Sequence, residues 1–173
     1  MLTRVILDFY GVWHRILTLG RVIHMELCVK RFEELTVNEL YEILKLRNAV
    51  FVVEQDCAYQ DCDDKDKAAF HVWLQENGNI VAYLRVMNVP PDTASLGRVI
   101  AAQRRCGMGT RIVQEGIRVV QERTDARYIK IHAQSYARKF YEKQGFRQEG
   151  EEFSEDGIPH IPMTLDLMGG IIV

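Results

Sequence analysis

The sequence has few of the residues that mark metal-binding and disulfide-rich proteins. Its four cysteines contain no Cys-x-x-Cys pair, so the ligand spacing of a structural zinc site is missing. Cys57 and Cys62 have the spacing to close a small loop. Because no credible export signal precedes them, we expect reduced thiols instead. We therefore predict that the protein holds no metal.

Long apolar runs and a strong charge of one sign are also missing. The chain has 22 basic and 24 acidic side chains, a net charge of −2 and a pI near 6.2. A nearly neutral chain has no general attraction to nucleic acid or to a membrane surface. Charged residues interrupt the apolar stretch over residues 2–24, and none of its uninterrupted apolar runs is long enough to span a bilayer. We expect a cytoplasmic protein with no nucleic-acid or membrane partner.

What remains is the sequence of one domain. A chain of 173 residues with 47% hydrophobic residues can fill one core. Residues 1–24 carry arginines and few acids, which is weakly typical of a transit peptide, and an upstream extension is an equal alternative. Met25 begins a stretch typical of a domain start. We predict an extension over 1–24, a folded domain over 25–167 and a tail over 168–173.

The stretch 96–120 organises the chain. An apolar run over 96–101 is followed by a glycine-punctuated turn over 103–109. After the turn, apolar residues recur at the spacing of one buried helix face: Ile112, Val113, Ile117 and Val120. A strand, a loop and a helix N-terminus in this order make an anion site, because the first amides of a helix have no intrahelical partner.

The turn itself has the composition of a phosphate cradle. Gly107 and Gly109 carry no Cβ, so the backbone there can approach an anion closely. Thr110 adds a hydroxyl group, and Arg104 and Arg105 add positive charge. No Lys follows Gly109, which excludes a P-loop, and the glycine pair does not complete a Rossmann fingerprint. We predict a phosphate or pyrophosphate site; the alternative is a glycine-rich connection with solvated arginines.

Periodicity and turn signals place the other elements. Strands are expected at 26–32, 71–75, 80–87, 96–101, 128–133, 146–153 and 160–167. Helices are expected from the capping box at Thr36 to about residue 51, through the stretch after the cradle, within the loop 54–67, and over 135–144 with Ser135 as N-cap. Asn77-Gly78 predicts a hairpin turn. Pro162 cannot donate to a ladder, so it should face an edge or a bulge.

Residues 104–109, Arg-Arg-Cys-Gly-Met-Gly, resemble the Arg/Gln-x-x-Gly-x-Gly/Ala signature of the GCN5-related N-acetyltransferases (GNAT). The order of elements is also that of this family. Further strings resemble its ElaA group, among them 46–55, 97–99, 133–134 and 155–160. The resemblance covers about 25–167 and implies an α/β (α+β mixed-sheet) fold, in which a central mixed sheet of about seven strands is flanked by helices. Residues 63–66 are compact where relatives often carry a longer loop.

The resemblance implies an N-acetyltransferase that uses acetyl-CoA and an amine acceptor, as a monomer or homodimer. The strands at 96 and 128 would splay apart and admit the pantetheine arm. Residues on the coenzyme side would be Val99, Ile100, Arg104, Arg105, Cys106, Gly107, Met108, Gly109, Thr110, Gln134 and Phe140. Tyr141 would be the general acid towards the CoA thiolate; its alternative is a core tyrosine beside Phe140. A non-catalytic acyl-CoA-binding module is the rival function.

The acceptor side is less defined. Candidates there are Glu54, Tyr59, Asp61, Arg85 and His160. The general base is not identified: Glu54, Asp61, His71, Glu151 and His160 are candidates by residue type only. For any single one of these we favour a buried or capping role. Arg47, Arg85 and Arg98 lie on otherwise apolar elements. We expect them to pair in the core with the acids of 54–66; a clamp for a substrate carboxylate is the alternative.

Overall fold

One mixed sheet of nine strands forms the centre of the fold. The computed structural model describes residues 14–18, 21–102 and 106–169, with side chains from Met25 onward. The strands are β1 (His14–Thr18), β2 (Arg21–Arg31), β3 (Phe70–Glu76), β4 (Asn79–Val89), β5 (Thr93–Ala101), β6 (Tyr128–Gln134), β7 (Arg147–Gln148), β8 (Phe153–Glu155) and β9 (Ile158–Asp166). Their order is β1-β2-β3-β4-β5-β6-β9-β7, with β8 also paired to β9. Only the pairing of β5 with β6 is parallel among the described strands.

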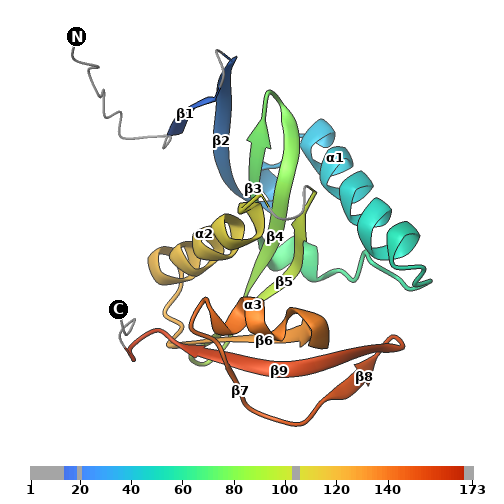
Figure 1. Cartoon of the computed structure of the whole chain (residues 1–173), viewed down its shortest axis with the longest axis vertical. Coiled ribbons are helices and arrows are strands. Elements are labelled where there is room, and N and C mark those ends of the chain that lie inside the picture. The colour runs from blue at the N-terminus through green and yellow to red at the C-terminus, as the bar shows by residue number, and fades with distance from the viewer. Residues whose placement is uncertain (1–13, 19–20, 103–105, 170–173) are drawn as a thin grey trace.

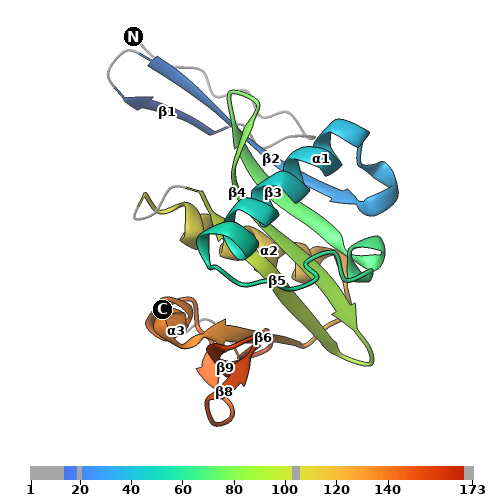
Figure 2. The ribbon, with the colours of Figure 1, turned by 90° about the vertical axis from the view of Figure 1, so that its right-hand side faces the viewer.

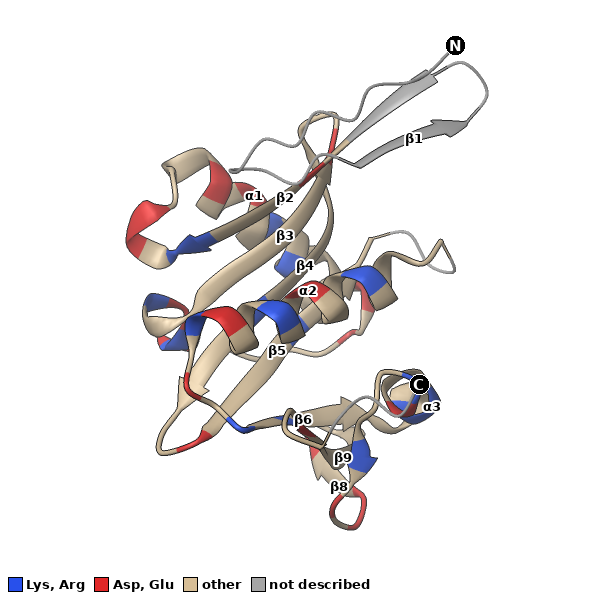
Figure 3. Ribbon diagram, turned by 90° about the vertical axis from the view of Figure 1, so that its left-hand side faces the viewer, with Lys and Arg blue, Asp and Glu red and all other residues tan. Residues whose placement is uncertain are grey.

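Helices cover both faces of this sheet (Figure 1). The helix α1 (Val37–Arg47) lies across one face, as Figure 2 shows, and continues as a π-helical segment, η2 (Asn48–Glu54). The helix α2 (Met108–Arg123) lies across the other face, with charged residues of both signs along it (Figure 3). The shorter α3 (Arg138–Glu142) follows β6. Single turns of 3₁₀-helix occupy Phe32–Glu34, Lys65–Ala68 and Ser135–Ala137.

Local signals decided several of these elements. The Thr36 hydroxyl accepts from the Glu39 amide at 3.2 Å, and the Thr36 amide donates to the Glu39 carboxylate at 2.8 Å, which is the predicted capping box. Asn77 and Gly78 join β3 to β4 with φ values of +50° and +81°. These two left-handed residues form the turn that matches the twist of a hairpin. Both predictions are confirmed.

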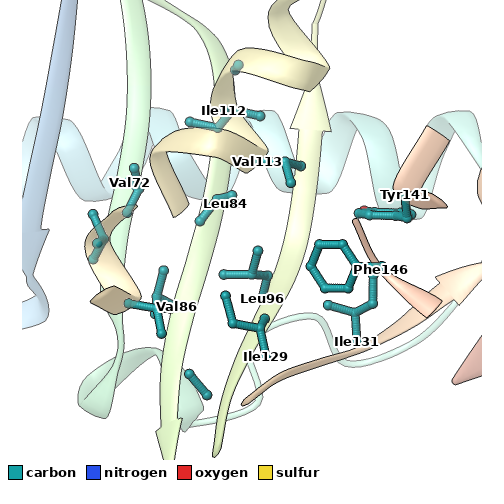
Figure 4. Close-up of a cluster of buried hydrophobic side chains, with 14 of the residues drawn as sticks. Val72, Leu84, Val86, Leu96, Ile112, Val113, Ile129, Ile131, Tyr141 and Phe146 are labelled. Atoms are coloured by element: carbon teal, nitrogen blue, oxygen red, sulfur yellow. The ribbon is translucent and has the colours of Figure 1, made fainter. Parts of the chain in front are cut away.

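Buried side chains divide into two cores, one on each face. The larger, the α2-face core, is continuous from β2 to α3 and includes Leu84, Leu96, Ile112 and Ile129 (Figure 4). A Cβ added to Gly116 of α2 would lie 2.7 Å from Leu84 Cδ2, so this glycine lets the helix approach the sheet closely.

The smaller core lies on the opposite face, beneath α1. Ile43 of α1 packs there against Trp73, Tyr83 and Ile100, which come from three neighbouring strands. We call this set the α1-face core. Because successive residues of a strand point to opposite faces, Val72 and Leu74 of β3 lie in the α2-face core, and Trp73 between them lies in the α1-face core.

The strands β5 and β6 separate partway along their length. They pair only at Thr93–Ser95 with Tyr128–Lys130. From Leu96 onward β5 has no partner strand on this side in the described part of the chain. The predicted splay is confirmed, and it leaves backbone donors and acceptors of β5 facing the gap.

Some expected boundaries differ. The strand expected at 26–32 begins at Arg21, although its pairing with β3 starts at Met25. The strand expected over 146–153 is divided into β7 and β8. Pro162 lies opposite this interruption, and its carbonyl accepts from the Glu149 amide at 3.0 Å. The proline nitrogen, which points to the same side, therefore meets a break in the ladder, as predicted.

Ser135 is not the N-cap that was expected. It lies inside the 3₁₀ turn, and its hydroxyl donates to the Glu152 carboxylate instead of accepting from a helix amide. The chain reverses after α3 at Gly145, whose φ of +91° fits the predicted C-terminal glycine. The domain limits at residues 25 and 167 stay predictions.

Candidate coenzyme and acceptor site

The N-terminus of α2 faces the end of β5, and its first amides have no partner among the described residues. Gly107 is the N-cap with a φ of +80°, a conformation that favours glycine. The first intrahelical bond runs from the Arg111 amide to the Gly107 carbonyl at 3.1 Å. The amides of Met108, Gly109 and Thr110 have no acceptor among the described residues. These amides and the helix dipole make a site suited to an anion.

The other cradle residues divide into exposed and packed ones. Cys106 and Gly107 are exposed, whereas Met108 to Thr110 are half-buried. A Cβ added to Gly109 would meet the Phe140 ring at 3.5 Å and Ala101 at 3.8 Å. Both distances are ordinary van der Waals contacts, so these neighbours do not require a glycine here, and the close approach of Gly109 to an anion stays a prediction. Arg104 and Arg105 lie outside the described residues.

Two predicted coenzyme residues lie on the free edge of β5. Val99 is half-buried against the α2-face core, and Ile100 is buried in the α1-face core. Both follow the point at which β5 and β6 stop pairing. The Ala102 amide bonds to the Val81 carbonyl of β4 at 2.9 Å, and Ile100 pairs with Tyr83, so the main-chain groups of Ile100 face β4. Those of Val99 face the splay, in position to pair with an extended ligand as a missing strand would.

Two further predicted residues border the splay from the C-terminal half. Gln134 ends β6, and its side-chain Nε2 donates to Gln55 Oε1 at 3.3 Å, which links β6 to the segment after η2. Phe140 of α3 packs against the first turn of α2 at Gly109. The structure thus brings β5, β6, α2 and α3 together around one gap.

Tyr141 lies beside Phe140 with its ring in the α2-face core. Its side chain is 8% exposed, and its ring meets Phe140 and Phe146 edge to face, with centroids 4.9 and 5.7 Å apart. No hydrogen bond joins its hydroxyl to another described residue. Burial raises the pKa of this phenol above its ordinary value, so the group keeps its proton at neutral pH.

Charged side chains from α1, β4 and β5 meet one loop on the α1 face. Three arginines of these elements pair with three aspartates that follow η2. We call this set the arginine–aspartate network: Arg47, Arg85, Arg98, Asp61, Asp63 and Asp66. It confirms the expectation that these arginines pair with acids of 54–66.

The first anchor of the network is Arg47, which is fully buried. Its Nε donates to Asp61 Oδ2 at 2.8 Å, and its Nη1 donates to Asp66 Oδ1 at 2.7 Å. Burial by itself would raise the pKa of Asp66, but hydrogen bonds from Arg47 and Arg85 outweigh it, and the net pKa lies below its ordinary value. Buried charges of this kind persist because each is paired.

The second anchor is Arg85, which is 2% exposed. Its Nη1 and Nη2 each donate to one oxygen of Asp63 at 2.7 Å. This fork-shaped contact lowers the pKa of Asp63. Burial acts in the opposite direction but is outweighed, and the pKa lies at about 2. The Arg85 Nε is buried without a hydrogen-bond partner among the described residues.

These contacts bear on the predicted acceptor side. Asp61 and Arg85 are held inside the network, and Tyr59 donates its hydroxyl to Asp61 Oδ1 at 2.7 Å. Burial, and then this hydrogen bond, raises the pKa of Tyr59. The three residues therefore fix the loop after η2, and their contact with an acceptor stays a prediction.

Of the remaining base candidates, His71 has a structural role. Its Nε2 lies 3.0 Å from the Asp66 carbonyl and its Nδ1 lies 2.9 Å from the Tyr83 hydroxyl. Burial lowers its pKa, which favours the neutral ring. It is fully buried, so it cannot meet a substrate amine.

Three acidic or histidine candidates lie nearer the surface. Glu54 ends η2, Glu151 is exposed between β7 and β8, and His160 lies in β9 with its Nδ1 2.8 Å from the Ile158 carbonyl. Cys57, after η2, approaches the carbonyl of Asp156 in the β8–β9 turn at 3.6 Å. These contacts bring the segment after η2 to the β8–β9 hairpin.

Sequence reasoning missed two contributors. Gln55 was not singled out, although it bridges to Gln134. Arg98 was predicted as an ion-paired residue, with a substrate clamp as the alternative, but its left-handed φ of +54° within β5 was not predicted. The available signal was Gly97-Arg98, which interrupts the apolar alternation of the strand and is typical of a bulge.

Other parts of the described chain have no features that point to another site. A surface hollow of about 620 Å³ lies at the far end of α2, beside Arg31, Arg123 and Asp125. No cluster of three or more histidine, cysteine or acidic side chains within 14–18, 21–102 and 106–169 has the arrangement of a metal site. Over the same ranges, no helix has the length and apolar composition needed to cross a membrane.

Comparisons with known proteins agree with this geometry. A family model described as an acetyltransferase (GNAT) domain matches residues 33–167. A UPF0039 protein of Schizosaccharomyces pombe is 36% identical over 148 residues, covering 83% of this chain and 99% of the relative. Protein ElaA of Escherichia coli is 35% identical over 141 residues, covering 78% and 92%.

Solved structures give the same result. The crystal structure of Escherichia coli ElaA superposes with a TM-score of 0.77 at 33% identity and covers 82% of this chain and 99% of that one. An acyl-CoA N-acyltransferase from Pseudomonas aeruginosa superposes with a TM-score of 0.76 at 31% identity, covering 80% and 98%.

Proposed function

Because the chain belongs to the ElaA-like group of the GNAT acetyltransferase family, we propose that it transfers the acetyl group of acetyl-CoA directly to a primary amine. Family membership supports acetyl transfer in general. The observation that carries the proposal is the splay of β5 from β6, which opens beside the free amides at the N-terminus of α2. Predictions of a cytoplasmic protein and of a monomer or homodimer stay predictions.

The proposal assigns coenzyme binding to two sets of backbone groups. Amides of the first turn of α2 would hold the pyrophosphate, because they have no acceptor within the described ranges and lie at the positive end of the helix dipole. The main-chain groups of Val99, on the free edge of β5, would pair with the pantetheine arm and polarise the thioester carbonyl. Both sets are fixed by secondary structure, so little ordering is required when the coenzyme binds.

Transfer then needs a neutral amine and a proton for the leaving thiolate. An amine with an ordinary lysine pKa costs roughly 4 to 5 kcal/mol to deprotonate at neutral pH, whereas an α-amine costs about 1 kcal/mol. Since the arginine–aspartate network and His71 are engaged in structural contacts, we propose an acceptor of low pKa. Tyr141, protonated at neutral pH, would supply the proton to the thiolate.

A binding experiment tests the cradle. At about 100 times Kd, acetyl-CoA should stabilise the fold by roughly 2.7 kcal/mol. Thr110→Glu should abolish the shift, because a carboxylate in the first turn of α2 repels a diphosphate while it favours the helix itself. Thr110→Gln, of equal size and no charge, should keep most of the shift. Equal shifts in both variants would refute the cradle.

Release of CoA thiol in the presence of α-amines, polyamines, lysine peptides and aminoglycosides tests turnover. Amine-dependent release supports the proposed enzyme and identifies its acceptor class. Binding of acetyl-CoA without amine-dependent release from any acceptor would instead indicate the non-catalytic acyl-CoA-binding module.

A further inference from the structure

The strand β5 contains a bulge immediately before the edge assigned to the coenzyme. Arg85 of β4 lies opposite Gly97, and Tyr83 lies opposite Ile100. The single residue Leu84 therefore faces two residues of β5, one of which is Arg98. Arg98 has a φ of +54°, which is disfavoured for a residue that carries a Cβ.

The bulge changes the face to which each later residue of β5 points. Leu96 and Val99 both pack in the α2-face core, although they are three positions apart, and Ile100 packs in the α1-face core. In an unbroken strand, residues three apart lie on opposite faces. Without the left-handed residue, Val99 and Ile100 would exchange faces, and their amides and carbonyls would exchange edges.

Contacts outside the strand hold Arg98 in this conformation. Its Nε donates to Asp61 Oδ1 at 2.7 Å, and its Nη2 lies 3.3 Å from the Asp61 carbonyl and 3.5 Å from Asp63 Oδ2. Each aspartate is fixed in turn by a buried arginine, Asp61 by Arg47 and Asp63 by Arg85. A strained backbone persists where its surroundings over-determine it in this way.

We propose that Arg98 is a positioning residue: its ion pairs to the loop after η2 hold the β5 bulge, and the bulge turns the main-chain groups of Val99 towards the coenzyme and those of Ile100 towards β4. This inference rests on the proposed function and extends it to a residue that need not touch acetyl-CoA. The loop that carries Asp61 and Asp63 would thereby influence the coenzyme side from the opposite face of the sheet.

Two substitutions of Arg98 remove the same ion pairs but differ in their tolerance of a left-handed φ, so they separate the effect of backbone conformation from the effect of charge. Arg98→Ala loses the contacts and keeps the penalty for a left-handed φ, so the bulge should relax. Arg98→Gly loses the same contacts but adopts this φ without penalty. We expect Arg98→Ala to lower kcat/KM for acetyl-CoA roughly tenfold or more, because small displacements of a reacting group are costly. Arg98→Gly should stay within roughly threefold of the unsubstituted protein, by the same reasoning.

A second readout and a control complete the experiment. Hydrogen exchange at the Ile100 amide, which faces β4, should rise in Arg98→Ala and stay low in Arg98→Gly. Arg118→Ala removes an ion-paired arginine from the outer side of α2 and should change neither quantity. If Arg98→Ala does not fold, Arg98→Asn and Arg98→Leu replace the pair, and Asn, which tolerates a left-handed φ, should retain more activity.

The outcomes are distinct. Equal kcat/KM values in Arg98→Ala and Arg98→Gly, whether both normal or both low, overturn the positioning role. A wild-type protein that shows neither an acetyl-CoA thermal shift nor CoA release overturns the proposed function and this inference with it. Rescue by glycine, with normal behaviour of Arg118→Ala, supports both.

Discussion

Replacing Tyr141 by phenylalanine separates catalysis from packing, because the substitution removes one oxygen and keeps the ring. The ring contacts with Phe140 and Phe146, at centroid distances of 4.9 and 5.7 Å, are retained. Since the hydroxyl has no hydrogen-bond partner among the described residues, no internal bond is lost. The free energy of unfolding should therefore change by no more than about 0.5 kcal/mol.

The effect on turnover should be much larger. If the Tyr141 hydroxyl delivers the proton to the CoA thiolate, kcat should fall by a factor on the order of 10² or more. The KM for acetyl-CoA should hardly move, because the proposed pyrophosphate contacts lie in the first turn of α2. Steady-state thiol release gives kcat and KM, and denaturant unfolding gives the free energy. Tyr41→Phe, at an exposed position of α1, is the matched control and should leave all three quantities unchanged.

The raised pKa adds a stability test with a definite sign. The folded state favours the neutral phenol, so Tyr141 contributes stability that is complete below its unfolded pKa near 10 and is lost as the pH rises above it. Tyr141→Phe should therefore lessen the alkaline loss of stability. A variant with normal kcat would assign Tyr141 to packing. Loss of both stability and coenzyme binding would also refute this reasoning, since the hydroxyl would then hold the site together.

Three further predictions concern the fold. Hydrogen bonds from Arg85 lower the pKa of Asp63 from 3.8 to about 2. The stability that this carboxylate contributes should therefore be present above pH 3.8 and lost as the pH falls towards 2. Acid unfolding of Asp63→Asn should lack this loss. Gly116→Ala places a Cβ 2.7 Å from Leu84 Cδ2. We expect a net destabilisation of about 1 to 2 kcal/mol, because the cost of overpacking exceeds the gain in helix propensity. A raised Tm would contradict this prediction. Deletion of residues 1–24 removes β1 but leaves the β2–β3 pairing intact, so folding and the acetyl-CoA shift should be nearly unchanged, and insoluble protein would count against the predicted boundary.

Features that depend on neighbouring residues could be predicted from the sequence. The capping box at Thr36, the turn at Asn77-Gly78 and the buried face of α2 each follow from groups a few positions apart. The order of elements and the glycine turn were sufficient to predict the family and the splay of β5 from β6. These signals are local because backbone conformation and side-chain periodicity are set over one or two turns.

Long-range pairing was decided only by the tertiary structure. The sequence indicated that the arginines would pair with acids. It did not indicate that Arg47 forms an ion pair with Asp61 or that Arg85 forms one with Asp63, because each pair joins separate elements of the fold. The left-handed Arg98 depends on the same contacts. A strand pattern cannot reveal it, because the conformation is unfavourable for the isolated chain and exists only where the surrounding charges outweigh that cost.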